Sequence, residues 1–210
     1  MGGVQQYSAM RKAAIFIFVV ALLLLVSLAW SPRDFLTRRL AAAMINDSSV
    51  FRTTQRYSLR IGMVSNADYL SPESLVLQHR GWISAAGKKC PQNVAPPPCW
   101  DVTLTPSGVD TFRSLIAPDD AGKELLSIPV VKRELVSIGG ISKQGKFADV
   151  DFTWKWVPLN EVGAAIYSGD LRYRSTVSFR IYDDGWRIVE SSRHYGQNID
   201  EALKSADPAP

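Results

Sequence analysis

Cysteine and histidine are scarce in this chain, because its 210 residues contain two of each. Two thiols are too few for a disulfide-framework miniprotein or for a zinc site with four thiolates. Charged side chains are limited to 21% of the residues, while 46% are hydrophobic and 10% are aromatic. This composition excludes an intrinsically disordered chain. The length fits one domain, or one domain with a short appendage.

Catalytic and cofactor motifs are also missing. The sequence has no glycine-rich phosphate loop, no His-Glu-x-x-His motif and no Cys-x-x-Cys pair. His79 and His194 do not lie at a metal-ligand spacing, and we expect His194 to be solvated or to cap a helix. Ser191 and Ser192 precede His194 without the context of a nucleophile elbow. The sequence therefore predicts no catalytic residue, no metal and no cofactor.

One long apolar run occupies residues 13–30, which read AAIFIFVVALLLLVSLAW and carry no charge. A helix of this length spans roughly 27 Å, close to the hydrocarbon thickness of a bilayer. A core helix of a soluble protein would carry a polar stripe, and this run has none. We therefore expect residues 13–30 to form a transmembrane signal anchor after a short tail at residues 1–12.

A cleaved signal peptide is the alternative for the same segment. Arg11 and Lys12 fit its basic start, and Ser27 and Ala29 fit a cleavage site, but the apolar run is longer than usual and Trp30 would follow the cut. Basic residues flank the run on both sides, so their count does not decide its orientation. The short tail favours an N-terminus on the cytoplasmic side.

Residues 31–49 form the next predicted segment, a juxtamembrane amphipathic helix or a stalk that packs on the domain. Ser31 and Pro32 are typical of a helix start. Five residues give the segment an apolar side: Phe35, Leu36, Leu40, Ala43 and Met44. Five basic residues flank the anchor, and we expect them to contact lipid head groups: Arg11, Lys12, Arg33, Arg38 and Arg39.

The net charge of +4 resides entirely in this N-terminal part of the chain. The five flanking cations and Asp34 account for all of it, because residues 40–210 contain equal numbers of basic and acidic residues. The isoelectric point near 9.1 therefore reflects the membrane-flanking residues. We expect the lipid bilayer as a partner, together with another envelope or membrane protein or a small apolar ligand, and no nucleic acid.

The two cysteines close a ten-residue loop that contains three consecutive prolines, so the loop is expected to be extended and exposed. We predict a disulfide between Cys90 and Cys99, with free thiols as the alternative. Disulfides persist in oxidising compartments. The prediction therefore places a domain of residues 50–205 outside the cytosol, attached to the cell membrane, with a short tail at residues 206–210.

The domain is predicted to have an α+β fold, in which short helices and one or two strands precede a curved four-strand antiparallel meander. Alternation of polar and apolar residues or turn signals predict the strands, at residues 56–64, 100–105, 128–141, 147–157, 171–182 and 186–190. Helices are expected at residues 71–79, 109–116 and 199–204, a bulge at residues 139–140, and loops at residues 106–108 and 158–163.

An aromatic face is the candidate ligand-binding surface, and core filling is the simpler interpretation of the same residues. It comprises Trp154, Trp156, Tyr173 and Trp186. Asp149 and Asp151 fall on the opposite face of their strand, where we expect charge pairing across the sheet with arginines of the next strand, namely Arg172, Arg174 and Arg180.

The order of elements over residues 128–190 resembles the NTF2-like and cystatin-like folds, in which a curved meander wraps helices. Residues 150–163, VDFTWKWVPLNEVG, are similar to stretches of single-pass bacterial membrane proteins. The resemblance is architectural and supplies no catalytic residues. We expect a membrane-anchored, non-catalytic binding or assembly domain. One alternative is a cofactor-free hydrolase or isomerase with an aromatic-lined cavity. Another is a membrane-tethered winged-helix DNA-binding protein, because a helix, a strand, a loop and a strand succeed one another from residue 71 to residue 105.

Overall fold

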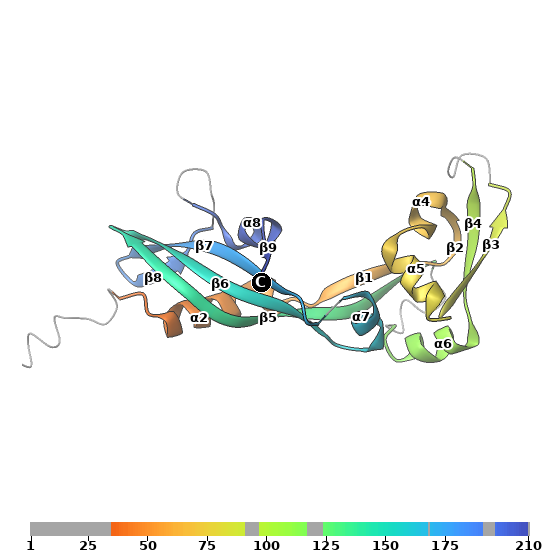
Figure 1. Cartoon of the computed structure of the whole chain (residues 1–210), viewed down its shortest axis with the longest axis horizontal. Helices are drawn as coiled ribbons and strands as arrows, with labels where there is room; N and C mark the ends of the chain where they lie inside the picture. The colour runs from red at the N-terminus through yellow and green to blue at the C-terminus, as the bar shows by residue number, and fades with distance from the viewer. Residues whose placement is uncertain (1–34, 91–96, 117–123, 168, 191–195, 210) are drawn as a thin grey trace, which may run out of the picture.

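A computed structural model describes residues 35–90, 97–116, 124–167, 169–190 and 196–209. The molecule is elongated, with a larger antiparallel sheet at one end and a smaller one at the other (Figure 1). The predicted α+β class is confirmed. The predicted membrane anchor at residues 13–30 lies outside the described residues, and none of the helices that the structure does describe is long and apolar enough to cross a membrane.

The larger sheet contains the predicted meander. It consists of β5 (Leu125–Gln144), β6 (Phe147–Pro158), β7 (Arg172–Tyr182) and β8 (Gly185–Ile188), hydrogen-bonded in that order. Two further strands join it: β1 (Gln55–Arg60) pairs with β5, and β9 (Asp207–Pro208) pairs with β7. The register between β5 and β6 shifts between Leu135 and Ser137 and again between Ile138 and Gly140, which confirms the predicted bulge.

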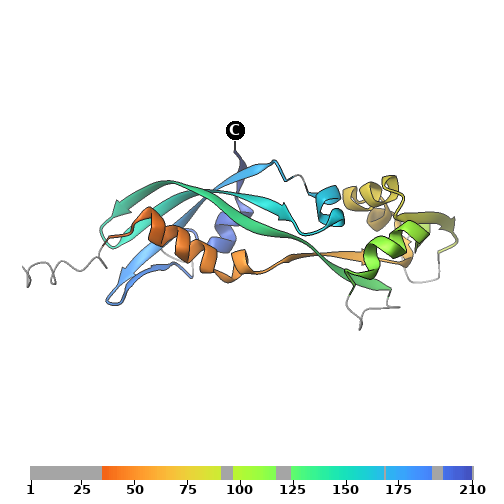
Figure 2. The same ribbon diagram turned by 90° about the horizontal axis from the view of Figure 1, so that it is seen from below.

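Helices α2 (Arg38–Asp47), α3 (Ser49–Arg52) and α8 (Ile199–Lys204) pack on this sheet, and α2 runs beside it in both views (Figures 1 and 2). Side chains of α2, α3, α8 and strands β6 to β8 form the first hydrophobic core. The α2 helix buries Ala41 and Ile45, so the described part of residues 31–49 packs on the domain.

The predicted apolar side of this segment is wrong in detail. The side chains of Phe35 and Leu40 are 63% and 37% exposed, whereas Ala41 and Ile45 are fully buried. The helix begins at Arg38, because the Thr37 hydroxyl caps it by accepting a hydrogen bond from the Leu40 backbone N–H. This start sets which residues face the sheet.

The smaller lobe holds the sheet β2-β4-β3, made of β2 (Gly62–Ser65), β3 (Ile83–Lys88) and β4 (Cys99–Leu104). Helices α4 (Asn66–Tyr69), α5 (Pro72–His79) and α6 (Pro106–Arg113) complete it. The single strand expected at residues 56–64 is therefore wrong. Gly62 has a φ of +84°, and at this position the chain leaves β1 of the larger sheet and enters β2 of the smaller one.

Two helices begin where loops were expected. Thr105 caps α6 by accepting a hydrogen bond from the Gly108 N–H at 3.0 Å, so this helix includes residues 106–108. Asn160 caps α7 (Glu161–Ile166), since its Oδ1 accepts from the Gly163 N–H at 2.9 Å. The predicted helices near residues 71–79 and 199–204 and the strand near residues 100–105 are confirmed.

The second hydrophobic core lies between the smaller lobe, β1, the first half of β5 and α7. Phe112, Leu77 and Ile128 are fully buried in it. Trp156, at the far end of β6, packs against both cores. The two ends of the molecule therefore share one aromatic side chain at their junction.

Candidate functional site

Three of the four aromatic residues predicted to form a ligand face lie together. Trp154 stacks on Tyr173, with ring centroids 4.7 Å apart, and its edge meets Trp156 at 5.2 Å. Trp186 is elsewhere: it is 5% exposed on β8 and pairs with Ile181, at the other end of β7 from Tyr173. The predicted set therefore divides between two places on the sheet.

Arg133 is a central member of this cluster that the sequence analysis missed. Its guanidinium lies 4.5 Å from the Trp156 ring centroid and 5.7 Å from that of Trp154. Its Nη1 donates a hydrogen bond to the Val50 carbonyl at 3.0 Å. Burial lowers the pKa of Arg133, and the nearby Asp200 carboxylate opposes that shift. The protein therefore places its own cation on its aromatic face.

The polar N–H group of the Trp154 indole is also hydrogen-bonded within the protein. It is 3% exposed, and its Nε1 donates to the buried Ser175 Oγ at 3.1 Å. With Arg133 over the rings and Tyr173 stacked on them, the aromatic face is filled by groups of the protein itself. This geometry favours core filling over a binding cavity at Trp154.

The carboxylates Asp149 and Asp151 have partners other than those expected. Asp149 accepts a hydrogen bond from the Ser178 hydroxyl at 2.6 Å, and Asp151 accepts one from the Thr176 hydroxyl at 2.6 Å. The predicted pairing with arginines is wrong because of the register, which sets Arg172 opposite Lys155, Arg174 opposite Thr153 and Arg180 opposite Phe147. Both carboxylates are exposed on the side of β6 opposite to Trp154.

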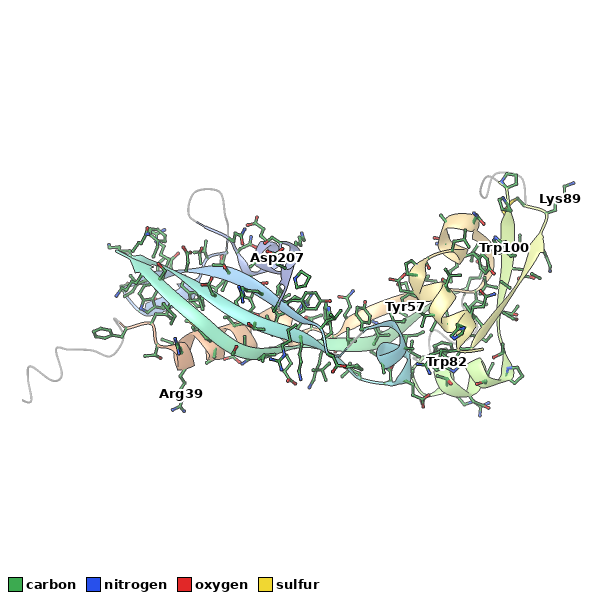
Figure 3. The ribbon with its side chains drawn as sticks, viewed as in Figure 1. Arg39, Tyr57, Trp82, Lys89, Trp100 and Asp207 are labelled. Atoms are coloured by element: carbon green, nitrogen blue, oxygen red, sulfur yellow. A yellow bond between two sulfur atoms is a disulfide. The ribbon has the colours of Figure 1, made fainter. Side chains whose placement is uncertain are left out.

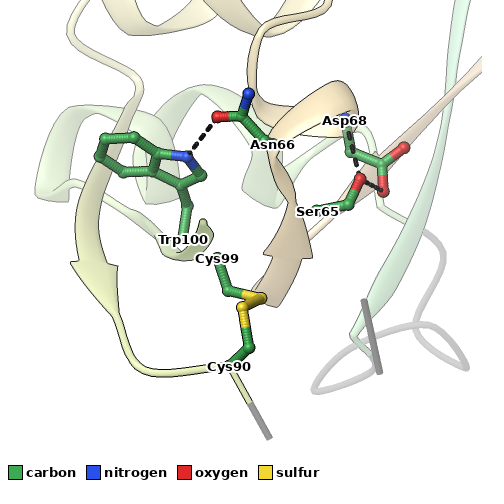
Figure 4. Close-up of a disulfide and its surroundings, with 6 residues drawn as sticks. All are labelled: Ser65, Asn66, Asp68, Cys90, Cys99 and Trp100. Atoms are coloured by element: carbon green, nitrogen blue, oxygen red, sulfur yellow. Dashed lines mark hydrogen bonds between the residues drawn. A yellow bond between two sulfur atoms is a disulfide. The ribbon is translucent and has the colours of Figure 1, made fainter. Parts of the chain in front are cut away.

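The predicted disulfide is present, with the Cα atoms of Cys90 and Cys99 5.2 Å apart (Figure 4). Cys99 is buried and lies opposite Ser65 of β2 in the sheet. The next residue, Trp100, donates from Nε1 to Asn66 Oδ1 at 3.0 Å and stacks on Tyr69 with centroids 4.1 Å apart. The disulfide-closed hairpin is therefore fixed to β2 and α4 at its base.

A cavity of about 430 Å³ lies where β1 meets helices α4 and α5. Tyr57, Arg60, Asp68 and Glu73 are among its lining residues, and Figure 3 shows Tyr57 at the junction of the two lobes. Burial raises the pKa of Tyr57; a hydrogen bond with Ser74 opposes this shift, and the Glu73 carboxylate adds to it. The cavity was not predicted from the sequence. Most of its walls come from residues 57–74, where the chain turns from β1 through β2 into α4 and α5, and Val102 and Leu125 complete it.

The five residues expected at lipid head groups are only partly described. Arg38 is exposed and donates from Nη2 to the Gly139 carbonyl at 3.3 Å. Arg39 is exposed and points away from the sheet (Figure 3). Arg11, Lys12 and Arg33 lie outside the described residues, as does His194. Among the residues that are described, no group of three or more His, Cys, Asp or Glu is arranged to hold a metal ion.

The smaller lobe exposes several large apolar side chains. Leu70 is 50% exposed, Leu75 is 43% exposed and Val109 is 40% exposed, and all three lie on or beside short helices. Leu125, at the start of β5, is 48% exposed. Contiguous patches of such side chains are typical of surfaces that contact another molecule, and Phe35 and Leu40 are exposed at the other end of the molecule as well.

Comparisons with protein-family models, with curated proteins and with solved structures find no match for this chain.

Proposed function

We propose that the chain is a single-pass membrane protein whose domain lies outside the cytosol and acts as a non-catalytic binding or assembly module. One observation carries this proposal. The first described segment, which leads into α2, lies at one end of the molecule, and the smaller lobe with the disulfide lies at the opposite end (Figure 1). An anchor at residues 13–30 would hold the lobe away from the membrane, where it can meet a partner.

A binding role is favoured by what the two surfaces offer. The aromatic face is occupied by Arg133 and by the protein's own rings, so it leaves little room for a substrate. The smaller lobe exposes Leu70, Leu75 and Val109. Exposed leucines beside the disulfide-closed β3–β4 hairpin suit a protein partner better than a small polar molecule.

The hydrolase or isomerase alternative gains no support from this geometry. It requires a polar group inside an aromatic cavity, with Asp149, Asp151 or Tyr173 as candidates. Asp149 and Asp151 lie on the exposed face, held by hydroxyl groups, and Tyr173 is stacked on Trp154. General acid–base chemistry would need one of them within reach of a bound substrate.

The winged-helix alternative gains one feature and lacks another. The order β2, α4, α5, β3, β4 gives a helix followed by a hairpin, as that alternative expects. However, α5 carries Glu73 and no Lys or Arg, and the amide in its last turn, Gln78, is hydrogen-bonded to the Tyr69 hydroxyl. Beyond it, the end of the helix offers His79 and the following Arg80. A recognition helix needs basic or amide side chains that reach phosphates and bases.

Thiol labelling and membrane extraction test the proposal on the full chain produced in bacteria. We expect the protein to stay in the membrane pellet after alkaline carbonate washing, and Cys90 and Cys99 to react with a membrane-impermeant maleimide in spheroplasts only after reduction. Release by carbonate would contradict the anchor. Labelling without reductant, or only after lysis, would contradict a domain in an oxidising compartment.

A further inference from the structure

The end of the larger sheet nearest residue 35 combines cations with aromatic rings. The β5–β6 and β7–β8 hairpins both turn at this end. The Arg180 guanidinium lies 5.5 Å from the Phe147 ring centroid and 5.1 Å from that of Tyr182. The Lys143 Nζ lies 5.8 Å from the Phe35 ring centroid and 5.2 Å from that of Trp186. Phe35 and Tyr182 are the exposed rings among these, and exposed aromatic rings interleaved with basic side chains suit the interface of a lipid bilayer.

The balance of charge at this end is positive. Lys143, Lys146, Arg180 and Arg187 come from the two hairpins, and Arg38 and Arg39 come from the first turn of α2. Asp183, Asp184 and Glu190 are the acidic residues nearby, and Asp184 pairs with Arg187. Among the described residues, no carboxylate comes within salt-bridge distance of Lys146 or Arg180.

Cross-strand neighbours add a reason for an anion to bind. Arg180 lies directly opposite Arg187 in the sheet, and the Arg187 guanidinium lies 5.4 Å from the ring of the same Tyr182. Like charges directly opposite each other destabilise a sheet. A cavity of about 280 Å³ lies beside them, lined by Phe147, Tyr182 and Glu190 as well as by both arginines. Because Asp184 already pairs with Arg187, Arg180 is the cation of this pair that an anionic group in the cavity would neutralise.

The predicted anchor would bring the phosphate groups of membrane lipids close to this end of the sheet. Phe35 contacts Lys143, so the chain enters the domain at these hairpins. Five residue steps separate Phe35 from Trp30, the last residue of the apolar run. A fully extended chain covers at most about 18 Å over that length. The basic end of the sheet is therefore tethered within about two Debye lengths of the bilayer surface.

We propose that the hairpin ends around Lys146, Arg180 and Tyr182 form a membrane-contact surface that binds the phosphate groups of anionic lipids. The inference rests on the proposed anchor at residues 13–30. It adds that the domain has a fixed orientation, with the hairpin ends on the bilayer and the disulfide-closed lobe pointing away from it.

Hydrogen exchange on the full chain in lipid vesicles tests this surface. The vesicles contain phosphatidylcholine alone or phosphatidylcholine mixed with phosphatidylglycerol. We expect exchange of the amides at residues 143–147 and 180–187 to be on the order of ten-fold slower with phosphatidylglycerol, because each basic residue near an anionic surface adds several-fold to binding. The same exchange rate in both lipid mixtures would overturn the proposal without needing any variant.

Matched variants locate the effect. The double variant Lys146→Gln/Arg180→Gln should lose the dependence on phosphatidylglycerol. The control Arg172→Gln/Arg174→Gln removes two exposed cations from the same strand, β7, away from the hairpin ends. This control should keep the dependence of exchange on phosphatidylglycerol. An equal loss in both variants would overturn the proposed surface, and so would the same slowing caused by inorganic phosphate in phosphatidylcholine vesicles. Loss of the protein from vesicles at high salt would instead contradict the anchor, which distinguishes the two failures.

Discussion

The guanidinium of Arg133 lies 4.5 Å from the ring centroid of Trp156, and Trp156 packs against both hydrophobic cores. The Tyr167 ring of the segment after α7 approaches the same indole at 5.6 Å. This aromatic contact joins the larger sheet to the smaller lobe, so the two ends of the molecule should unfold together.

The substitution Trp156→Ala should therefore lower the free energy of unfolding by about 3 kcal/mol, because a large aromatic group is lost from two cores at once. Chemical denaturation in detergent, followed by far-UV circular dichroism, measures this change. The control Leu159→Ala alters a side chain that is 44% exposed and should change stability by less than about 0.5 kcal/mol. Equal effects of the two substitutions would show that Trp156 does not join the cores.

Gly163 has no room for a side chain. A Cβ atom at this position would lie 1.9 Å from the Val130 carbonyl oxygen, so Gly163→Ala must displace α7 from β5. We expect a loss of about 3 kcal/mol in unfolding free energy. Gly140→Ala is the matched control, because its nearest atom, Asp151 Oδ2, is 3.5 Å away. A thermal melt in which both variants shift equally would contradict the close approach.

Removal of the disulfide by Cys90→Ser/Cys99→Ser should lower stability by about 2–3 kcal/mol, since the unfolded chain regains the freedom of a short loop. The loss should be greatest in the smaller lobe, where Cys99 is buried opposite Ser65 of β2. Hydrogen exchange measured by peptide would show faster exchange in β3 and β4 and little change in β7. A uniform increase over the whole domain would contradict a local clamp.

Two tyrosines make stability depend on alkaline pH. Burial raises the pKa of both Tyr57 and Tyr167 above the ordinary value of 10.0. Their contribution to stability is complete below that value, and it is lost as the pH rises from 10.0 through the higher pKa of the folded state, because the unfolded chain ionises first. The variant Tyr57→Phe/Tyr167→Phe should flatten this fall in a denaturation series measured between neutral and alkaline pH. An unchanged slope would contradict the burial of both phenols.

The meander could be predicted from the sequence because its strands bury one face and leave the other polar. Val150, Phe152 and Trp154 alternate with exposed residues, and this pattern survives in the structure. The break at Gly62 was not predictable in the same way. Alternation continues on both sides of it, and the chain changes sheets at Gly62, which has a positive φ.

The arrangement of the candidate site could not be predicted from the alternation of polar and apolar residues, because it depends on how neighbouring strands are aligned. The position of Arg133 over Trp156 follows from the pairing of β5 with β6, which a register shift interrupts between Leu135 and Ser137. A shift of one residue moves a side chain to the other face of a sheet. The partners of Asp149 and Asp151 depend on how β6 and β7 are aligned. That alignment sets Asp149 opposite Ser178 and Asp151 opposite Thr176, and it cannot be read from the charges of β7.

A topology reporter on the full chain tests the central claim most directly. Alkaline phosphatase, which is active only after export, and a green fluorescent protein that folds only in the cytosol are each fused after Pro210 and produced in a bacterial host. A membrane-anchored domain outside the cytosol predicts high phosphatase activity and no fluorescence, with both fusions in the membrane fraction. Fluorescence without phosphatase activity would contradict that placement.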